Sequence, residues 1–488
     1  MLSRPQAWPL GAGLAVSLCL NACVAPLELD RSLAMPIQYD EAASDTTDSP
    51  ELRHWWRRFD DPLLARLVER AVAHNYDVRI ALASVQSARA QALRAHSALL
   101  PQFGAAASAD RYGIDPDNQQ LAEQGYDEFR VDQWQLALQT SWEVDLFGSS
   151  RLRLQAAQQQ QLASLAEVHA TRLSIAASVA QTYFELRATD LRMGNLRQGR
   201  DIARQFADIA ARLFKSGDVG REDLISAQAE LDNTDAQLAE LQHNRTRLRL
   251  SLERLCGELP GSLEDELPVI ASLPQLPPAV APGQPVDLLM RRPDLMALQA
   301  QVRAATAQSS ASRRELWPSL NISGVLARSR LYLDGDNLGL TDMAQLSASM
   351  SLPLIDFGAR RAAIELADSD ARQSMLRFES RVLQAMQEVE EALSAQHSGA
   401  LRVASLQAAV DRRSEVLEIA LRRYEIGDGA RPDVLQARRD LLDSRDALLG
   451  ARLSLLEVQL QLYRALGGGW EPLMTQVPPP ADEDENTG

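Results

Sequence analysis

The sequence contains a long internal repeat whose spacing is constant. A Phe-Gly pair ends at Gly148 and again at Gly358, and each is followed by a long Ala/Gln/Leu-rich segment that stops at a second glycine, Gly217 or Gly427. Corresponding glycines of the two copies are 210 residues apart. Beyond each second glycine, mostly apolar side chains recur every seven residues over five heptads. These features predict a duplicated protein in which each half folds back as a coiled-coil hairpin of long helices.

Helices of unusual length are predicted in both halves. The long segments should be helical over 148–216 and 358–426, and helices over 221–256 and 432–466 should follow the glycine turns. At 1.5 Å per residue each long helix would extend roughly 100 Å, which exceeds what a globular domain needs. One heptad position reads Leu224, Leu231, Leu238, Arg245 and Leu252 in the first copy and Val434, Leu441, Leu448, Leu455 and Leu462 in the second.

A shorter helix and a β-hairpin are predicted ahead of each long helix. In the first half, Asp61-Pro62 is a favourable helix start, and the helix should continue to about Leu100, where Pro101 ends it. Alternating polar and apolar side chains then predict the strands. The hairpins are expected over 102–142 and 319–352, with connecting loops over 113–129 and 331–341.

The strand predicted over 132–142 alternates strictly. Trp134 and Trp142 share one face with two leucines, while glutamines and small residues occupy the other. A strand that is apolar outward, polar inward and bounded by aromatic rings is typical of membrane barrels, so these tryptophans are predicted to form a membrane girdle. Four strands cannot close a barrel, because the smallest bacterial barrels have about eight and open edges are not tolerated in lipid. Strands of other copies of the chain must complete it.

The N-terminal segment predicts export and lipid attachment. Residues 1–22 have the short apolar core of a signal peptide. The run Leu20-Asn21-Ala22-Cys23 resembles a bacterial lipobox, in which the cysteine is lipidated and becomes the new N-terminus. An ordinary cleaved signal followed by a chance cysteine is the alternative. The mature chain is then expected to comprise an anchor and equatorial segment (23–61), repeat 1 (62–259), a Pro-rich equatorial linker (260–286), repeat 2 (287–466) and an equatorial or disordered tail (467–488).

Charge and residue usage exclude several classes of function. Lys and Arg number 50 against 66 Asp and Glu, a net charge of −16 that disfavours a nucleic-acid partner. The six histidines are not spaced as metal ligands, and no nucleophilic triad is apparent. We therefore expect no catalytic residue, metal site or cofactor, and no enzymatic activity. Cys256, at the end of a heptad helix, is predicted to be a free and inert thiol.

Together these residues resemble the TolC/OprM family of outer-membrane efflux factors, including its NodT-like lipoproteins. The motifs that carry the resemblance are Cys23, Trp55-Trp56, Asp61-Pro62-Leu63-Leu64, a Leu-Pro or Trp-Pro before each hairpin, Asp145-Leu-Phe-Gly148, Asp356-Phe-Gly358 and the two glycine-turn heptads. The resemblance implies a mainly α-helical protein with a transmembrane β part. In such a homotrimer, four strands per chain close a twelve-stranded barrel in the outer membrane above a periplasmic tunnel of helices.

The resemblance also implies a function and partners. The trimer would be the passive exit duct of a tripartite efflux pump, set in outer-membrane lipid. It would dock to a periplasmic adaptor (membrane fusion) protein and an inner-membrane efflux pump, for which the RND type is expected. The alternative from another class is a lipid-anchored coiled-coil scaffold in the periplasm. A scaffold would explain the heptads and the anchor, but it would not explain four alternating strands with tryptophan at their ends.

By the same resemblance, the two glycine turns are the periplasmic tips that close the tunnel and meet the adaptor. The adaptor-docking residues would be Gly217, Asp218, Val219, Gly220, Gly427, Asp428 and Gly429. The periplasmic gate would comprise Asp223, Asp433, Tyr424 and Arg431. Two departures affect the gate, because Gly429 stands where the family has an arginine and Gln436 where some members have a second acid. Arg431 or Arg221 is expected to replace that arginine. Asp223 and Asp433 also have a simpler interpretation, as acids that stabilise helix N-termini.

Overall fold

The computed structural model describes residues 36, 38–40, 52, 54–114, 129–269, 272–278, 280, 282–333 and 335–468. The predicted signal peptide, Cys23, most of the first strand loop and nearly all of the tail lie outside these residues. The chain forms two compact units. The sheet unit comprises the described residues of Gln86–Leu162 and Gln299–Arg377, and the hairpin unit comprises the described residues of Leu33–Val85, Ala163–Leu298 and Phe378–Gly488.

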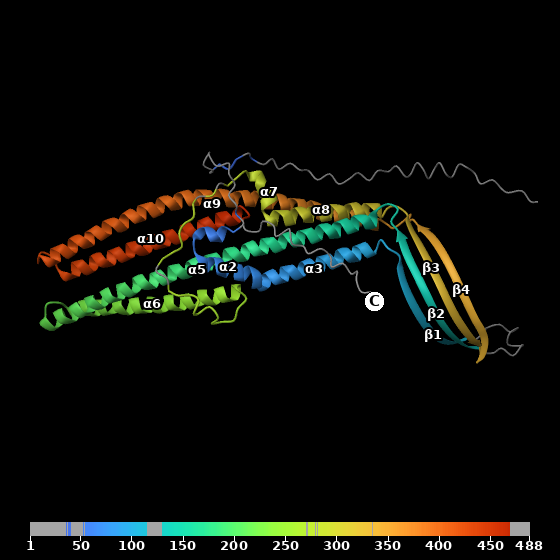
Figure 1. The fold of residues 1–488 in the computed structure, drawn as a ribbon, viewed down its shortest axis with the longest axis horizontal. Coiled ribbons are helices and arrows are strands. Elements are labelled where there is room, and N and C mark those ends of the chain that lie inside the picture. Colours follow the sequence, from blue (N-terminus) through green and yellow to red (C-terminus); the bar gives the residue numbers. More distant parts are fainter. Residues whose placement is uncertain are drawn as a thin grey trace, which may run out of the picture. The chain divides into compact units, whose positions relative to one another are not determined.

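The sheet unit contains four antiparallel strands in the order β1-β2-β3-β4 (Figure 1). The strands are β1 (Gln102–Ile114), β2 (Phe129–Val144), β3 (Ser319–Leu333) and β4 (Asp336–Ser351). Pairing of β2 with β3 joins the two predicted hairpins into one sheet. Strands β1 and β4 each have a single strand neighbour in the described part of the chain.

The prediction of a loop over 331–341 is wrong. Strand β3 continues to Leu333 and β4 begins at Asp336, so the connection is a tight turn in which Gly335 has a φ of +91°. A register shift at Leu331/Tyr332 lies opposite Gly339, whose φ is +107°. Positive φ suits glycine, and a bulge absorbs one extra residue while pairing continues. Glycines and polar side chains therefore form a turn and a bulge where the sequence suggested an open loop.

The first helix is interrupted at Asn75, which corrects the prediction of a continuous helix to about Leu100. The two segments are α2 (Pro62–His74) and α3 (Tyr76–Ser97). The Asn75 side-chain oxygen accepts hydrogen bonds from the amides of Asp77 (2.8 Å) and Val78 (3.4 Å), which caps α3. The second half has a similar break at Arg292, between α7 (Leu288–Arg291) and α8 (Pro293–Arg314), after the short helix η2 (Pro285–Asp287).

The predicted long helices are present and nearly equal in length. Helix α5 (Ser149–Ser216) has 68 residues and α9 (Ala359–Glu425) has 67. Helices α6 (Arg221–Leu255) and α10 (Arg431–Ala465) have 35 residues each. In the hairpin unit, α6 runs back beside α5 and α10 runs back beside α9 (Figure 1). Within the described residues, no helix is both long and apolar enough to cross a membrane.

An aromatic core fills the hairpin unit around the short helix η1 (Trp55–Phe59). Trp55 stacks on Tyr463 with a centroid separation of 5.5 Å, and Phe59 packs on Phe184 at 5.1 Å. Toward the glycine turns the buried apolar cluster shrinks to Ile202, Leu435 and Leu442, with Phe206 and Ile209 beside it. Since apolar burial is the main stabilising term, the hairpins are held firmly near η1 and weakly near their turns.

Candidate functional site

The two glycine turns have the same hydrogen-bonded geometry. Gly217 has a φ of +84°, its amide bonds to the carbonyl of Phe214 (3.2 Å), and the next amide, of Asp218, bonds to that of Leu213 (2.9 Å). This is a Schellman ending, which needs a left-handed residue at its centre. Gly427 repeats it with a φ of +80° and an Asp428 amide bond to the carbonyl of Arg423 (2.8 Å).

The residues predicted to dock the adaptor form these turns. Six of the eight positions at 217–220 and 427–430 are exposed, and only Val219 and Gly429 are half-buried. A Cβ at Gly429 would lie 3.2 Å from the backbone of Arg423 and Tyr424, so a larger residue there would require a small shift of this turn. Arg423 in turn donates hydrogen bonds to a side-chain oxygen (3.2 Å) and the carbonyl (3.1 Å) of Asp428.

Asp223 and Asp433 cap the helices that leave the turns. A carboxylate oxygen of each accepts a hydrogen bond of 3.1 Å from a backbone amide three residues earlier, that of Gly220 or Ala430. Both carboxylates are therefore oriented by helix starts, as the simpler interpretation predicted. The capping bond uses one oxygen, and both residues are exposed. Capping and a gate role are compatible.

The structure brings one predicted gate residue into contact with the other hairpin. The Arg431 guanidinium donates a hydrogen bond of 3.2 Å to the side-chain oxygen of Gln205 on α5. Tyr424 is 46% exposed, and its hydroxyl has no hydrogen-bond partner in the described residues. Arg431 therefore provides one link between the hairpins, and the gate roles of Tyr424 and Arg431 stay predictions.

Sequence reasoning missed further polar contacts between the hairpins. Arg439 of α10 pairs with Glu230 of α6 (2.5 Å), and Arg192 of α5 pairs with Asp446 of α10 (3.4 Å). These side chains line a groove of about 790 Å³ between α5, α6 and α10. The partners are more than 200 residues apart in sequence, so no local pattern could have identified them.

In the sheet unit, the two girdle tryptophans have different surroundings. Trp134 is 61% exposed on the apolar face of β2, beside the exposed Leu136 and Leu138. Trp142 is half-buried, and its indole nitrogen donates a hydrogen bond of 3.0 Å to the carbonyl of Leu99, beyond the end of α3. Trp142 therefore also ties the strand to the preceding helix, and the membrane role of both rings stays a prediction.

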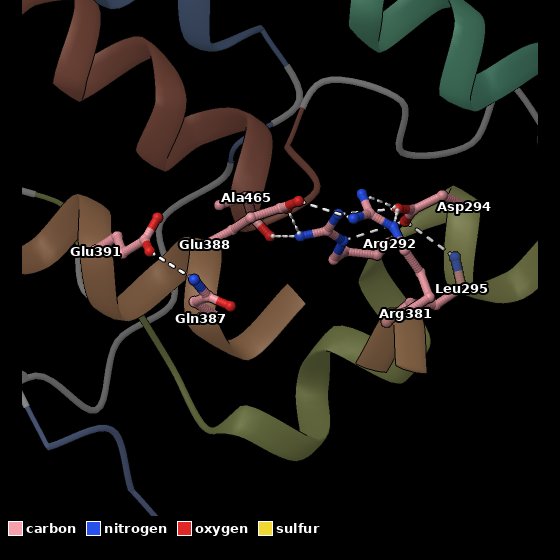
Figure 2. A network of polar contacts seen from close by, with 8 residues as sticks. All are labelled: Arg292, Asp294, Leu295, Arg381, Gln387, Glu388, Glu391 and Ala465. Carbon is pink, nitrogen blue, oxygen red and sulfur yellow. Dashed lines mark hydrogen bonds and ion pairs between the residues drawn. The ribbon is translucent and has the colours of Figure 1, made fainter. Parts of the chain in front are cut away.

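A network of ion pairs around one buried arginine lies at the end of α10 (Figure 2). The Arg292 side chain is 5% exposed and donates hydrogen bonds to Asp294 (2.8 Å), Glu388 (2.7 Å) and the carbonyl of Ala465 (3.1 Å). Arg381 contacts both carboxylates as well. Burial alone would raise the pKa of Asp294 and of Glu388, but the hydrogen bonds and charges of the two arginines hold both below their ordinary values.

A second buried network lies in the first half, around Asp190. Arg245 donates a hydrogen bond of 2.6 Å to this carboxylate and one of 3.2 Å to the carbonyl of Leu267. Arg187, which is 1% exposed, donates to the carbonyl of Pro268 (2.7 Å) and to the hydroxyl of Tyr183 (2.8 Å). The charged heptad residue Arg245 is thus explained, because it fixes the Pro-rich linker to the first hairpin.

Cys256 is a buried free thiol, as the sequence predicted. Its sulfur lies 3.8 Å from the carbonyl oxygen of Leu67. Burial, with a smaller contribution from the nearby carboxylate of Glu258, raises the thiol pKa to about 12. The thiol is therefore protonated at neutral pH and a poor nucleophile.

Comparison with known proteins agrees with this architecture. The outer membrane efflux protein family matches residues 67–258 and 285–468, which covers both halves. Nodulation protein T of Rhizobium leguminosarum bv. trifolii is 26% identical over 461 residues, covering 94% of this chain and 97% of that protein. Outer membrane protein OprJ of Pseudomonas aeruginosa is 28% identical over 478 residues, covering 94% and 96%.

A solved structure extends the similarity to the fold. The Campylobacter jejuni CmeC outer membrane channel is similar with a TM-score of 0.80 and 25% identity, and the match covers 91% of this chain and 95% of that one. The fold class predicted from the repeat, the heptads and the alternating strands is confirmed, as is the resemblance. This chain belongs to the outer membrane efflux protein family.

Proposed function

We propose that the protein is the outer-membrane exit duct of a tripartite efflux pump. The observation that carries the proposal is the family match across both halves, each with a strand pair and a helical hairpin. It is supported by the sheet, in which β1 and β4 have free edges among the described residues. Open edges are not tolerated in lipid. Three copies would pair these edges and supply twelve strands, and their long helices would form a periplasmic tunnel.

The proposal gives each segment a role. Residues 1–22 direct export, Cys23 carries the lipid, and the segments 23–61, 260–286 and 467–488 surround the hairpins at their equator. The glycine turns meet a periplasmic adaptor, which connects the duct to an inner-membrane pump of the RND type. The chain itself carries out no catalysis and needs no cofactor. Substrates move passively, and the partner pump supplies the energy.

The turns would act as the gate. In a trimer, Asp223 and Asp433 would each be present three times around the axis, and like carboxylates at close range repel one another and attract cations. The bond between Arg431 and Gln205 holds the second hairpin against the first. The small apolar cluster near the turns resists separation only weakly. Adaptor binding could therefore spread the tips while the aromatic core stays packed.

Substitution of Asp433 by Asn tests the gate. Asparagine removes the charge but keeps an oxygen that can accept the Ala430 amide, so the helix cap is retained. In planar bilayers, we expect Asp433→Asn to change cation conductance and to weaken block by divalent cations. Asp411→Asn, at an exposed position on α9, is the matched control. Unaltered conductance and block in the Asp433 variant would remove this residue from the gate.

The oligomeric mass tests the duct itself. Native mass spectrometry of the full-length protein, extracted from outer membranes with its lipid intact, should give a trimer acylated at Cys23. A periplasmic monomer would instead favour the coiled-coil scaffold, and the barrel would have to be abandoned.

A further inference from the structure

The arginines of the sheet share one face and one end. Strands β1 to β4 contain four arginines and no lysine. Arg328 is the cross-strand partner of Leu136, and Arg330 is the partner of Trp134. Directly opposed residues of neighbouring strands project from the same face. The other two arginines, Arg111 and Arg130, share this face at the end where the strands are joined in pairs.

The opposite end of the same face carries no charge. There, Trp142 is opposite Ile322, and Ile322 is opposite Ala348. Leu138, opposite Leu326, lies between the two ends, and both leucines are 60% exposed. The face therefore changes from a wide apolar band to a basic and aromatic edge, here called the basic edge (Arg111, Arg130, Trp134, Arg328 and Arg330).

Among the strand residues, arginines outnumber acids at the basic edge. Two acids share it, Asp132 paired with Arg111 (2.5 Å) and Asp342 paired with Arg328 (2.7 Å). The remaining strand acids, Asp110, Glu143 and Asp336, pair with residues of the other face. Four arginines thus share this face of the strands with two strand acids, in a chain whose net charge is −16.

Donor groups remain available at this edge. A guanidinium has five N–H donors, and Arg328 uses two of them on Asp342. Arg330 makes one long contact, 3.5 Å, to the Tyr332 hydroxyl, and it has no carboxylate within ion-pair distance in the described strands. Charges on a lipid-facing surface are unfavourable at mid-membrane but tolerated near the interface. The basic edge is therefore at headgroup level if the sheet spans a membrane.

We propose that the basic edge binds the phosphate of a membrane lipid headgroup. The proposal rests on the proposed function, because it requires the sheet to span the outer membrane. Arginine binds phosphate through paired N–H donors, and the Trp134 ring beside Arg330 suits the boundary between acyl chains and headgroups. Acyl chains would lie against the exposed leucines of the band. The phosphate binds where Arg328 and Arg330 offer donors two residues apart on one strand.

The test compares two forms of one lipid. The full-length protein in detergent is mixed with phosphorylated lipid A or with its enzymatically dephosphorylated form, and bound lipid is counted by native mass spectrometry. The parent protein should prefer the phosphorylated form by about tenfold or more. Arg328→Gln/Arg330→Gln should lose most of that preference. Arg402→Gln/Arg412→Gln removes equal charge from exposed positions of α9 and should retain it.

Two further variants change the site without removing its charge. Asp342→Asn releases Arg328 from its acid and should increase phosphorylated-lipid retention severalfold. Arg330→Lys keeps the charge but loses the paired donors, and it should weaken retention less than Arg330→Gln. The proposal is overturned by equal retention of the two lipid forms, by equal losses in the α9 control, or by release of lipid with inorganic phosphate, which would indicate a site for free anions.

Conductance separates this proposal from the proposed function. Parent and Arg328→Gln/Arg330→Gln proteins should both insert and conduct in bilayers of uncharged lipid. A protein that conducts but does not discriminate the two lipid forms overturns only the headgroup site. A parent protein that neither inserts nor conducts overturns the duct.

Discussion

The two halves of the hairpin unit bond equivalent backbone carbonyls with different side chains, one neutral and one charged. In the first half, the side-chain amide of Asn75 donates a hydrogen bond to the carbonyl of Leu255, the last residue of α6 (2.9 Å). In the second half, the Arg292 guanidinium does the same for Ala465, the last residue of α10 (3.1 Å). A neutral amide and a cation thus satisfy equivalent carbonyls. The cation also needs carboxylates, which Asp294 and Glu388 provide.

Near the Pro-rich linker, by contrast, the charged network lies in the first half, and the equivalent residues of the second half do not form it. The first half buries Asp190 with Arg187 and Arg245, whereas the equivalent positions of the second half, 210 residues later, are Ala400, His397 and Leu455. The network around Asp190 and the network around Arg292 therefore lie at different levels of the two hairpins. The two copies thus retain equivalent bonds to the carbonyls at the ends of α6 and α10, whereas the charged residues around these positions differ between the copies.

The largest effect is expected from substituting two glycines at which equivalent backbone segments of the two halves approach closely. A Cβ added at Gly257 would lie 2.6 Å from the carbonyl oxygen of His74, and one at Gly467 would lie 2.6 Å from that of Arg291. Both have positive φ. We expect Gly257→Ala and Gly467→Ala to lower the free energy of unfolding by similar amounts, about 3–4 kcal/mol, from left-handed strain plus collision. Denaturant unfolding in detergent measures this.

The matched control is the pair of turn glycines. Gly217 and Gly427 also have positive φ, but an added Cβ there would meet nothing within 4 Å. Their alanine variants should lose only about 1–2 kcal/mol. A large difference between Gly257→Ala and Gly467→Ala would show that the halves do not share this contact.

The next test separates a charged from a neutral bond to the same carbonyl. Arg292→Met removes the cation and leaves two carboxylates with Arg381 alone, so we expect a loss of about 3 kcal/mol. Asn75→Ala removes the buried amide bond to Leu255 together with the cap of α3, and it should cost about 2 kcal/mol. Unfolding midpoints of both variants decide the comparison, and equal losses would mean that the charge adds nothing.

A third test transfers the residues of one half to the other. Arg245→Leu copies Leu455 but leaves Asp190 buried with Arg187 only, at 4.0 Å, and should cost about 2 kcal/mol. Adding Asp190→Ala, which copies Ala400, should recover part of this loss. The coupling between the two substitutions should be about 0.5–3 kcal/mol in a double-mutant cycle. If the free-energy losses of the two single variants simply added in the double variant, the two side chains would not interact, and the ion pair would be contradicted.

The smallest effect is a difference in acid stability. Because the folded pKa values of Asp294 and Glu388 lie below their ordinary values of 3.8 and 4.5, their contribution is complete above about pH 4.5 and is lost as the pH falls further. Between pH 5 and 3 the parent should lose on the order of 1–2 kcal/mol from this network. Arg292→Met should show a shallower pH dependence over that range.

Sequence pattern located the long elements well because strong local signals mark their ends. Glycine turns and heptads placed α5, α6, α9 and α10 within one or two residues of their observed bounds. The break at Asn75 was not predicted because the apolar stripe of Leu67, Ala71 and Val78 continues across it; in the structure Asn75 has an extended ψ of 138° and caps α3. The tight turn at Gly335 was missed because polar residues and glycines suit loops and bulged strands equally.

The candidate site was only partly accessible from sequence. The paired glycines and Asp223 and Asp433 share a local spacing that could be read directly. The contact between Arg431 and Gln205 joins residues 226 positions apart, and Arg292 meets Glu388 across 96. Such pairs are set by how the helices pack, which a single sequence does not encode in any local period.

The equal spacing of the repeats has an evolutionary consequence. From Gly148 to Gly257 and from Gly358 to Gly467, the two copies have kept the same number of residues. One inserted residue in an α-helix advances everything beyond it by 1.5 Å and rotates it by about 100°. The apolar heptad positions beyond the insertion would then no longer face the partner helix, and the glycine turn would be displaced along the helix axis. Length change in these segments is therefore far more restricted than substitution, and diversification should enter the family through side chains here and through insertions only outside the hairpins.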